Sequence, residues 1–188
     1  GCGKTYTMLF LSRLLGLRDR DAFENPTIVI ITDREDLDRQ TSELFVCSKR
    51  YLHDNNVRSI ESRKNLQEAL GTETTGLLKA AEGSASYCVT GAESGGVFLT
   101  TIQKFCESTG LLCNRSNIIC ISDEAHRTQT GVGSKLKMTD KGVFTTFGFA
   151  KYLRDSFPNA TYCGFTGTPI DETIAVFGDV VDSYTMKE

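Results

Sequence analysis

The chain has 188 residues, of which 39% are hydrophobic and 24% charged, a composition typical of one folded domain and not of extended disorder. Its 21 Lys and Arg against 24 Asp and Glu give a net charge of −3, so any binding to nucleic acid must depend on local geometry. Ser12 and Arg13 interrupt the apolar residues 8–11, and no window reaches the length of a membrane span. No signal peptide is visible, so we expect a cytoplasmic protein without membrane contact.

The seven cysteines form no C-x-x-C pair, and His53 and His126 are the two histidines. This pattern argues against a zinc site. Cys120 and Cys163 lie within apolar runs, where cysteine behaves as a small buried hydrophobe. We expect reduced thiols, as in other cytoplasmic proteins.

Hydrophobic periodicity predicts alternating helices and strands. In chain order they are a helix over residues 5–15, a strand over 27–32, a helix over 34–49, a strand over 57–60, a helix over 63–70, strands over 97–101 and 118–122, a helix over 148–157, and strands over 161–165 and 180–186. Ser62 is a good N-cap for the third helix, which Gly71 should end. Residues 81–96 and 131–142 are predicted to be loops, because they are rich in Gly and polar residues. The alternation predicts an α/β fold with a doubly wound, mostly parallel sheet in one domain.

The first five residues, GCGKT, match the second half of the phosphate-binding pattern G-x-x-x-x-G-K-[ST]. In a complete loop, backbone N–H groups and the N-terminus of the next helix surround the β-phosphate. Lys4 would then contact the β- and γ-phosphates, and the Thr5 hydroxyl would ligate Mg²⁺. The alternative is a glycine-rich turn before a helix. Because Met and the strand that should precede such a loop are missing, we expect a fragment cut at its nucleotide site.

The predicted strand over residues 118–122 runs directly into Asp123 and Glu124. Ligands of α/β proteins bind at the carboxyl ends of parallel strands, so both carboxylates are candidates for catalysis. Asp123 would hold Mg²⁺ through water, and Glu124 would deprotonate the water that attacks the γ-phosphate. The alternative is an acidic turn that caps the next segment.

Thr166, Gly167 and Thr168 follow the predicted strand over residues 161–165. Small hydroxylic residues there can hydrogen-bond to the acidic motif and respond to the bound nucleotide. The alternative is a tight turn, since Gly and Pro commonly end strands.

Two further strand ends carry polar residues, in the segments TDREDL and TTIQKF. Hydroxyls, amides and cations there can hold a phosphate backbone without reading bases. Asp33 and Thr101 are equally suitable as helix N-caps, so both interpretations stay open.

Taken together, these strand ends resemble the motor core of helicase superfamily two, and more closely the restriction (R) subunit of type I restriction–modification enzymes. The segments similar to motifs I, Ia, Ib, II and III and to the segment after them are GCGKTYTM, ITDREDLDRQ, FLTTIQKF, IICISDEAHRTQTG, FPNATYCGFTGTPI and FGDVVDSYTM. The resemblance covers the chain from end to end. It implies a RecA-like P-loop NTPase fold over residues 1–188 that lacks its first, P-loop strand.

The resemblance implies an ATP- and Mg²⁺-dependent translocase on double-stranded DNA, a hydrolase that works as part of a type I deoxyribonuclease. Its partners would be specificity and methyltransferase subunits, together with a nuclease domain and a second motor domain of the same parent chain. The residues implied for ATP, Mg²⁺ and hydrolysis are Gly1, Cys2, Gly3, Lys4, Thr5, Asp123 and Glu124. Those implied for coupling hydrolysis to movement are His126, Arg127, Thr166, Gly167 and Thr168, and those facing DNA are Arg34, Thr101 and Gln103.

The missing parts carry expectations of their own. Without the second motor domain there is no arginine finger, which can contribute about 10³–10⁵ in rate, so the chain alone should hydrolyse ATP negligibly. Without the first strand we expect a gap inside the sheet and a marginal, association-prone fold. Two alternatives remain: a motor domain of another superfamily-two DNA or RNA helicase, and a catalytically silent binding fragment.

Overall fold

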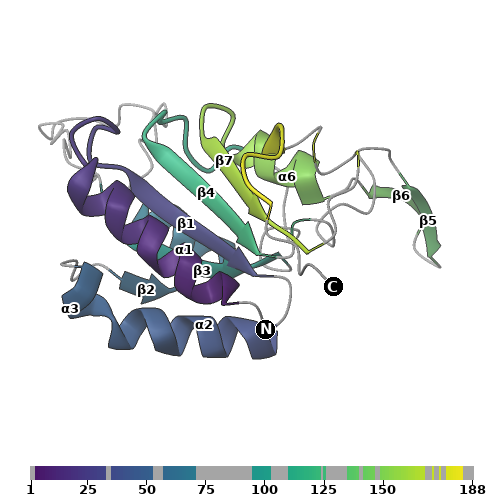
Figure 1. Ribbon diagram of the computed structural model, residues 1–188. Coiled ribbons are helices and arrows are strands. Elements are labelled where there is room, and N and C mark those ends of the chain that lie inside the picture. Colours follow the sequence, from purple (N-terminus) through teal and green to yellow (C-terminus); the bar gives the residue numbers. More distant parts are fainter. Residues whose placement is uncertain are drawn as a thin grey trace, which may run out of the picture.

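A computed structural model of the chain shows an α/β fold built on a five-stranded parallel sheet (Figure 1). The structure describes residues 3–32, 35–52, 57–70, 95–102, 110–123, 125, 135–139, 142–146, 149–167, 171, 174 and 177–183. The strands, in spatial order, are β2 (Val57–Ser59), β3 (Val97–Thr101), β1 (Thr27–Thr32), β4 (Ile118–Asp123) and β7 (Thr161–Phe165). The predicted fold class, doubly wound with a parallel sheet, is confirmed.

The three central strands form because their sequences are continuous apolar and β-branched runs. Every residue of β1, β3 and β4 is buried, as expected for strands covered on both faces. The bounds predicted for β1, β3 and β7 are confirmed, while β4 extends one residue further, to Asp123, and β2 ends at Ser59. This extra residue brings a carboxylate into the sheet itself.

Helices cover both faces of the sheet. On one face lie α1 (Lys4–Arg13), α2 (Glu35–Cys47) and α3 (Lys49–Leu52); Figure 1 shows α1 in front of the strands and α2 and α3 below them. Their buried side chains, among them Met8, Leu9 and Phe45, share a core with alternate residues of β1, β3 and β4. On the other face, α4 (Arg63–Ala69) and α6 (Phe149–Ser156) belong to a second core. Full burial stabilises by about 1.5–3 kcal/mol for each large apolar side chain, so these two cores hold the layers together.

The helix boundaries depart from the predictions at two places. α1 ends at Arg13 and continues as a π-helical turn, η1 (Leu14–Arg18), in which the Asp19 N–H donates to the Leu14 carbonyl at 2.9 Å. Gly16, a weak helix former, lies in the middle of this turn. The helix predicted over residues 34–49 is divided at Ser48 into α2 and α3.

The N-cap of α4 is as predicted. The Asn65 N–H donates to the Ser62 Oγ at 3.2 Å, and α4 begins at the next residue, Arg63. Gly71, the predicted stop, lies outside the described residues, as do residues 81–94 of the first predicted loop.

The second predicted loop, over residues 131–142, is wrong. Within and just after it lie β5 (Lys135–Thr139) and β6 (Gly142–Thr146), which pair antiparallel from Lys135↔Thr146 to Thr139↔Gly142. Glycine and charge suggested a loop, but short strands in a two-stranded ribbon tolerate both. The strand predicted over residues 180–186 is also wrong in its described part, because residues 180–183 are not in a strand.

The expected gap inside the sheet is absent. The strand order β2-β3-β1-β4-β7 is continuous, and each neighbouring pair is hydrogen-bonded. β7 is an edge strand in the described sheet, with β4 as its one strand neighbour there. In the described ranges, no helix is long and apolar enough to cross a lipid bilayer.

Candidate functional site

The chemistry-bearing residues gather at one rim of the sheet, where the parallel strands end. Figure 1 shows the N-terminal end of α1 at the same rim as the arrowheads of β1 and β4. Parallel pairing places the last residues of β1, β3, β4 and β7 side by side, as in the register Thr32↔Thr101 and Asp123↔Phe165. Ligands of doubly wound folds bind at this rim.

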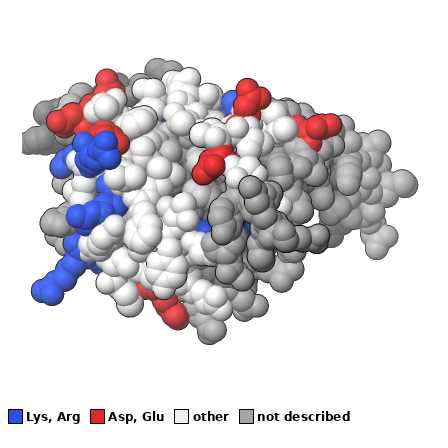
Figure 2. Space-filling view, viewed as in Figure 1, with Lys and Arg blue, Asp and Glu red and all other residues white. Residues whose placement is uncertain are grey.

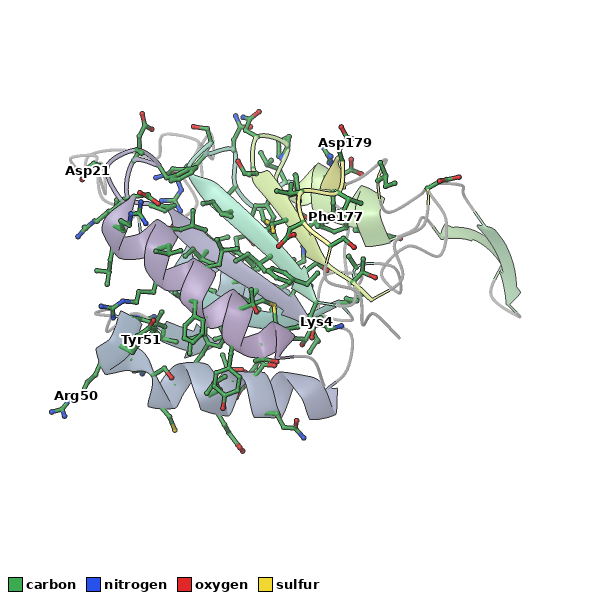
Figure 3. The ribbon with its side chains drawn as sticks, in the orientation of Figure 1. Lys4, Asp21, Arg50, Tyr51, Phe177 and Asp179 are labelled. Carbon is green, nitrogen blue, oxygen red and sulfur yellow. The ribbon has the colours of Figure 1, made fainter. Side chains whose placement is uncertain are left out.

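Lys4 and Asp123, far apart in the sequence, meet here. The Lys4 Nζ lies 3.7 Å from the Asp123 Oδ1, and their side chains are 23% and 10% exposed. Lys4, labelled in Figure 3, is the first residue of α1, and Asp123 is the last residue of β4. Lys4 and Asp123, two residues predicted to serve the same nucleotide, therefore lie at one rim, while Thr168 lies outside the described residues.

The backbone at the start of α1 suits an anion. Gly3 has φ +78° and ψ 13°, a left-handed conformation that favours glycine, and no atom lies within 4 Å of the position a Cβ would take. The first turn of α1 holds no acidic residue, no side chain caps it, and Lys4 adds a positive charge to the positive end of the helix. Thr5 follows, half-buried. Gly1 and Cys2 lie outside the described residues.

The segment after β7, which begins with Thr166, lies beside the segment after β4, which contains Ala125. The Ala125 N–H donates to the Phe165 carbonyl at 3.0 Å, which ties the segment after β4 to the end of β7. Thr166, half-buried, and Gly167, exposed, follow directly. Three other predicted residues of these motifs, Glu124, His126 and Arg127, lie outside the described residues.

Buried hydroxyls line the same ends of β3 and β4. Within the described residues, Thr100 Oγ1, Thr101 Oγ1 and Ser122 Oγ are buried and have no hydrogen-bond partner. Thr101 is 1% exposed, so its hydroxyl is not at the surface where DNA could reach it in this structure. The other two residues predicted to face DNA, Arg34 and Gln103, lie outside the described residues. The sequence analysis did not single out Thr100 or Ser122, although both are polar residues at the end of an apolar strand.

The donors at this rim fit a hard divalent cation. The Asp123 carboxylate and the Thr5 hydroxyl supply oxygen ligands, the kind that Mg²⁺ prefers. Among the described residues, no three His, Cys, Asp or Glu side chains cluster as a metal site would require. Mg²⁺ often keeps several waters and binds through one or two protein groups together with substrate phosphates, which agrees with this sparse set.

Cations gather elsewhere on the molecule. Figure 2 shows Lys and Arg side chains along the left edge, where Figure 3 labels Arg50 and Tyr51. At this edge the Arg13 guanidinium lies 4.2 Å from the centre of the Tyr51 ring and donates to the Tyr51 carbonyl, which joins α1 to α3. The Arg13–Tyr51 contact is therefore a polar feature that lies away from the Lys4–Asp123 rim.

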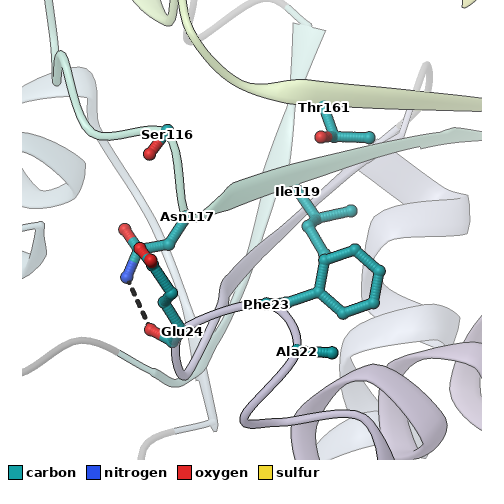
Figure 4. A pocket seen from close by; sticks show the side chains of 7 residues that line it. All are labelled: Ala22, Phe23, Glu24, Ser116, Asn117, Ile119 and Thr161. Carbon is teal, nitrogen blue, oxygen red and sulfur yellow. Dashed lines mark hydrogen bonds between the residues drawn. The ribbon is translucent and has the colours of Figure 1, made fainter.

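One such feature is a cavity of about 220 Å³ at the opposite end of the strands (Figure 4). Phe23, Ile119 and Thr161 line it, and the Asn117 side chain donates to the Glu24 carbonyl at its edge, at 2.9 Å. Ile119 and Thr161 lie near the amino ends of β4 and β7, so this cavity is separate from the Lys4–Asp123 rim.

Four described cysteines, Cys47, Cys113, Cys120 and Cys163, are free thiols. Burial raises the pKa of the Cys120 thiol far above its ordinary value, and burial also raises the pKa of Cys163. A buried, protonated thiol such as that of Cys120 is unreactive.

Comparison with known proteins gives one consistent result. The sequence profile of the SWI2/SNF2 ATPase family matches residues 1–82 and 84–188. The chain is 40% identical over 198 aligned residues to the type I restriction enzyme HindI endonuclease subunit of Haemophilus influenzae, and 32% identical over 197 to the MjaIXP endonuclease subunit of Methanocaldococcus jannaschii. It is 25% identical over 205 to the type I restriction enzyme SsaAORF53P endonuclease subunit of Staphylococcus saprophyticus.

Each of these alignments covers 100% of the chain but 16%, 15% and 17% of the relative, so the chain spans about one sixth of their length. No protein of known structure matches the chain significantly. The resemblance to type I restriction subunits is confirmed by these relatives. The family profile matches nearly every residue of the chain. The fold agrees with it, because Lys4 and Asp123 meet at the ligand-binding rim of a parallel sheet. The chain belongs to the SWI2/SNF2 ATPase family.

Proposed function

We propose that residues 1–188 form one motor domain of a type I restriction endonuclease subunit, which hydrolyses ATP to move double-stranded DNA. The observation that carries this proposal is the 3.7 Å approach of the Lys4 Nζ to the Asp123 Oδ1 at the ligand-binding rim of the sheet. The similarity to endonuclease subunits over the whole chain supports the restriction system rather than another use of the same fold.

The N-terminal end of α1 binds the phosphates of ATP. Gly3 adopts the left-handed conformation that turns the chain into the helix, and the first turn of a helix offers backbone N–H groups to an anion. Lys4 exchanges its contact with Asp123 for the β- and γ-phosphates, and Gly1 and Cys2 belong to the same phosphate-binding loop. Thr5 and Asp123 would hold Mg²⁺, which would neutralise charge that develops on the phosphates during hydrolysis.

Glu124 accepts a proton from the attacking water. The water oxygen forms a bond to the γ-phosphorus, the bond from that phosphorus to the β–γ bridging oxygen breaks, and the bridging oxygen leaves with ADP. The proton held by Glu124 then passes to solvent or to phosphate, so the residue returns to its carboxylate form.

Thr166, Gly167 and Thr168 communicate the state of the nucleotide to the rest of the motor, together with His126 and Arg127. The hydrogen bond between the Ala125 N–H and the Phe165 carbonyl supports this role, because it joins the two motifs directly. Arg34, Gln103 and Thr101 contact the DNA backbone, and for Thr101 this requires a rearrangement that exposes it. The specificity and methyltransferase subunits select the DNA, and nuclease and second motor domains of the parent protein complete the enzyme.

Binding of a fluorescent ATP analogue with Mg²⁺ to the chain tests the nucleotide site. Lys4→Ala removes a charge-assisted contact of about 1.5–3 kcal/mol and should weaken binding about 10- to 100-fold. Lys64→Ala is the matched control, because its side chain is 83% exposed on α4, on the other face of the sheet. Equal affinity of Lys4→Ala and Lys64→Ala would refute the proposed nucleotide site.

A chimera tests the activity. The 188 residues would replace the aligned segment of the Haemophilus influenzae HindI endonuclease subunit, and the complex would be assembled with the specificity and methyltransferase subunits. We expect DNA-stimulated ATP hydrolysis and displacement of a third strand from a DNA triplex, without separation of the duplex strands. Strand separation would favour a helicase of another branch, and a folded, silent complex would favour the binding fragment.

A further inference from the structure

Gly164, the second-last residue of β7, lies against Ala125, which follows Asp123 and Glu124 in the sequence. A Cβ built at Gly164 would be 2.9 Å from the Ala125 Cβ, a separation that real Cβ atoms essentially never show. Ala125 is fully buried. The missing side chain at position 164 is therefore what lets the Ala125 methyl lie directly on the β7 backbone.

Phe177 closes the other side of the same position. Its Cγ would be 3.0 Å and its Cδ1 3.2 Å from that Cβ. The ring of Phe177, labelled in Figure 3, packs edge-on against Tyr162, with centroids 6.5 Å apart at 79°. Tyr162 is itself anchored, since its hydroxyl donates to the Phe157 carbonyl at the end of α6. Ala125, Gly164 and Phe177 thus form a tight packing unit on a fixed support.

The backbone fixes Ala125 as well. Its N–H donates to the Phe165 carbonyl at 3.0 Å, and Asp123 is in register with Phe165 in the β4–β7 ladder. Asp123 and Ala125, the two residues that flank Glu124 in the sequence, are therefore both held against Phe165 at the end of β7.

We propose that Gly164 is a positioning residue for ATP hydrolysis: its lack of a side chain lets Ala125 dock on β7, which fixes the backbone on both sides of Glu124. This inference rests on the proposed function. The nucleotide-binding residues Lys4 and Thr5 belong to α1, which takes no part in this packing unit. Gly164 therefore governs the rate of hydrolysis and not the affinity for ATP.

Hydrogen exchange of the Ala125 amide in the chain tests the packing directly. Gly164→Ala should speed this exchange at least tenfold, because the added methyl pushes Ala125 away from the Phe165 carbonyl. Gly16→Ala is the matched control, since nothing lies within 4 Å of a Cβ there. Adding Ala125→Gly to Gly164→Ala removes the 2.9 Å clash and should restore protection at position 125, since the remaining contacts with Phe177, at 3.0 and 3.2 Å, require a shift of only a few tenths of an ångström.

Kinetics of the chimeric complex test the positioning role. Per folded complex, Gly164→Ala should lower kcat for ATP at least tenfold with KM changed less than twofold, and Ala125→Gly in the same chain should recover most of the loss. A merely structural glycine would alter the folded fraction and leave kcat of the folded complex unchanged.

The outcomes separate the two proposals. An inactive unsubstituted chimera, or one insensitive to Lys4→Ala, would overturn the proposed function, and unchanged Ala125 exchange in Gly164→Ala would overturn the packing inference by itself. Loss of ATP affinity without loss of kcat would overturn the positioning role. If Gly164→Ala fails to fold, recovery of the fold by Ala125→Gly supports the packing, and no recovery refutes it.

Discussion

Replacement of Thr101 by Val should stabilise the chain. Thr101 is 1% exposed, and its Oγ1 has no hydrogen-bond partner among the described residues. A buried hydroxyl without a partner costs about 1–3 kcal/mol, and Val has nearly the same shape without this penalty. At the lower end of that range, we expect about 1 kcal/mol of added stability and a rise in Tm of about 2–4 °C for a domain of this size.

Thr27 provides a matched control at the other end of the sheet. It is fully buried, but its Oγ1 accepts from the Arg115 guanidinium at 2.9 Å and from the Gly95 N–H at 3.2 Å. Thr27→Val would leave both donors without this acceptor, so it should destabilise by about 1–3 kcal/mol.

Urea unfolding followed by circular dichroism measures both variants, with the slope of the transition checking that the unfolded state is unchanged. The two substitutions remove the same atom from the same residue type in buried strands, so opposite signs isolate the effect of the missing partner. A Thr101→Val variant less stable than the parent would refute the reasoning, because it would show that the Thr101 hydroxyl is satisfied.

Three further predictions follow from local contacts. Ser62→Ala removes the acceptor for the Asn65 N–H and should cost about 1 kcal/mol in urea unfolding, whereas an unchanged midpoint would mean that the cap contributes nothing. Burial raises the pKa of the Cys120 thiol in the folded state, so the folded chain binds this proton more tightly than the unfolded chain does. The contribution of this proton to stability is fully present below the ordinary thiol pKa of about 8.5. Above that pH it is lost, at up to about 1.4 kcal/mol per pH unit. Cys120→Ala should flatten this alkaline decline, and an identical decline in the variant would contradict the assignment. In thiol labelling of the native chain, exposed Cys47 should react well before Cys120, and equal rates would show that the core opens readily.

Most of the central sheet could be predicted because each strand is encoded locally. The runs TIVIIT, VFLTT and IICIS are rich in apolar and β-branched residues, so each is recognisable as a strand without its partner. The carboxyl end of β4 carries Asp123, and the first residue of α1, Lys4, meets it at the same rim.

The errors arose where context decides the structure. β5 and β6 contain Lys, Thr and Gly, residues common in loops, and their pairing with each other is not visible in either segment alone. The interior gap was expected because the strand before the phosphate-binding loop is missing, but the position of that strand in the sheet cannot be derived from chain order. In the described sheet the strands are continuous, with β7 at the edge beside β4. In the same way, no sequence pattern predicts that position 164 must lack a side chain, because that requirement comes from the packing of Ala125 and Phe177 against it.

α1 connects two parts of the molecule that lie far apart in the sequence. α1 is a rod of ten residues, about 15 Å long, with Lys4 at one tip and Arg13 at the other. Met8 and Leu9, in the middle of α1, are buried against the sheet. At the other end of α1, the Arg13 side chain contacts the Tyr51 ring of α3 and donates to the Tyr51 carbonyl. α1 therefore has a different partner at each end, Asp123 of β4 at the Lys4 end and Tyr51 of α3 at the Arg13 end. One short helix thus connects the carboxyl end of the sheet to α3.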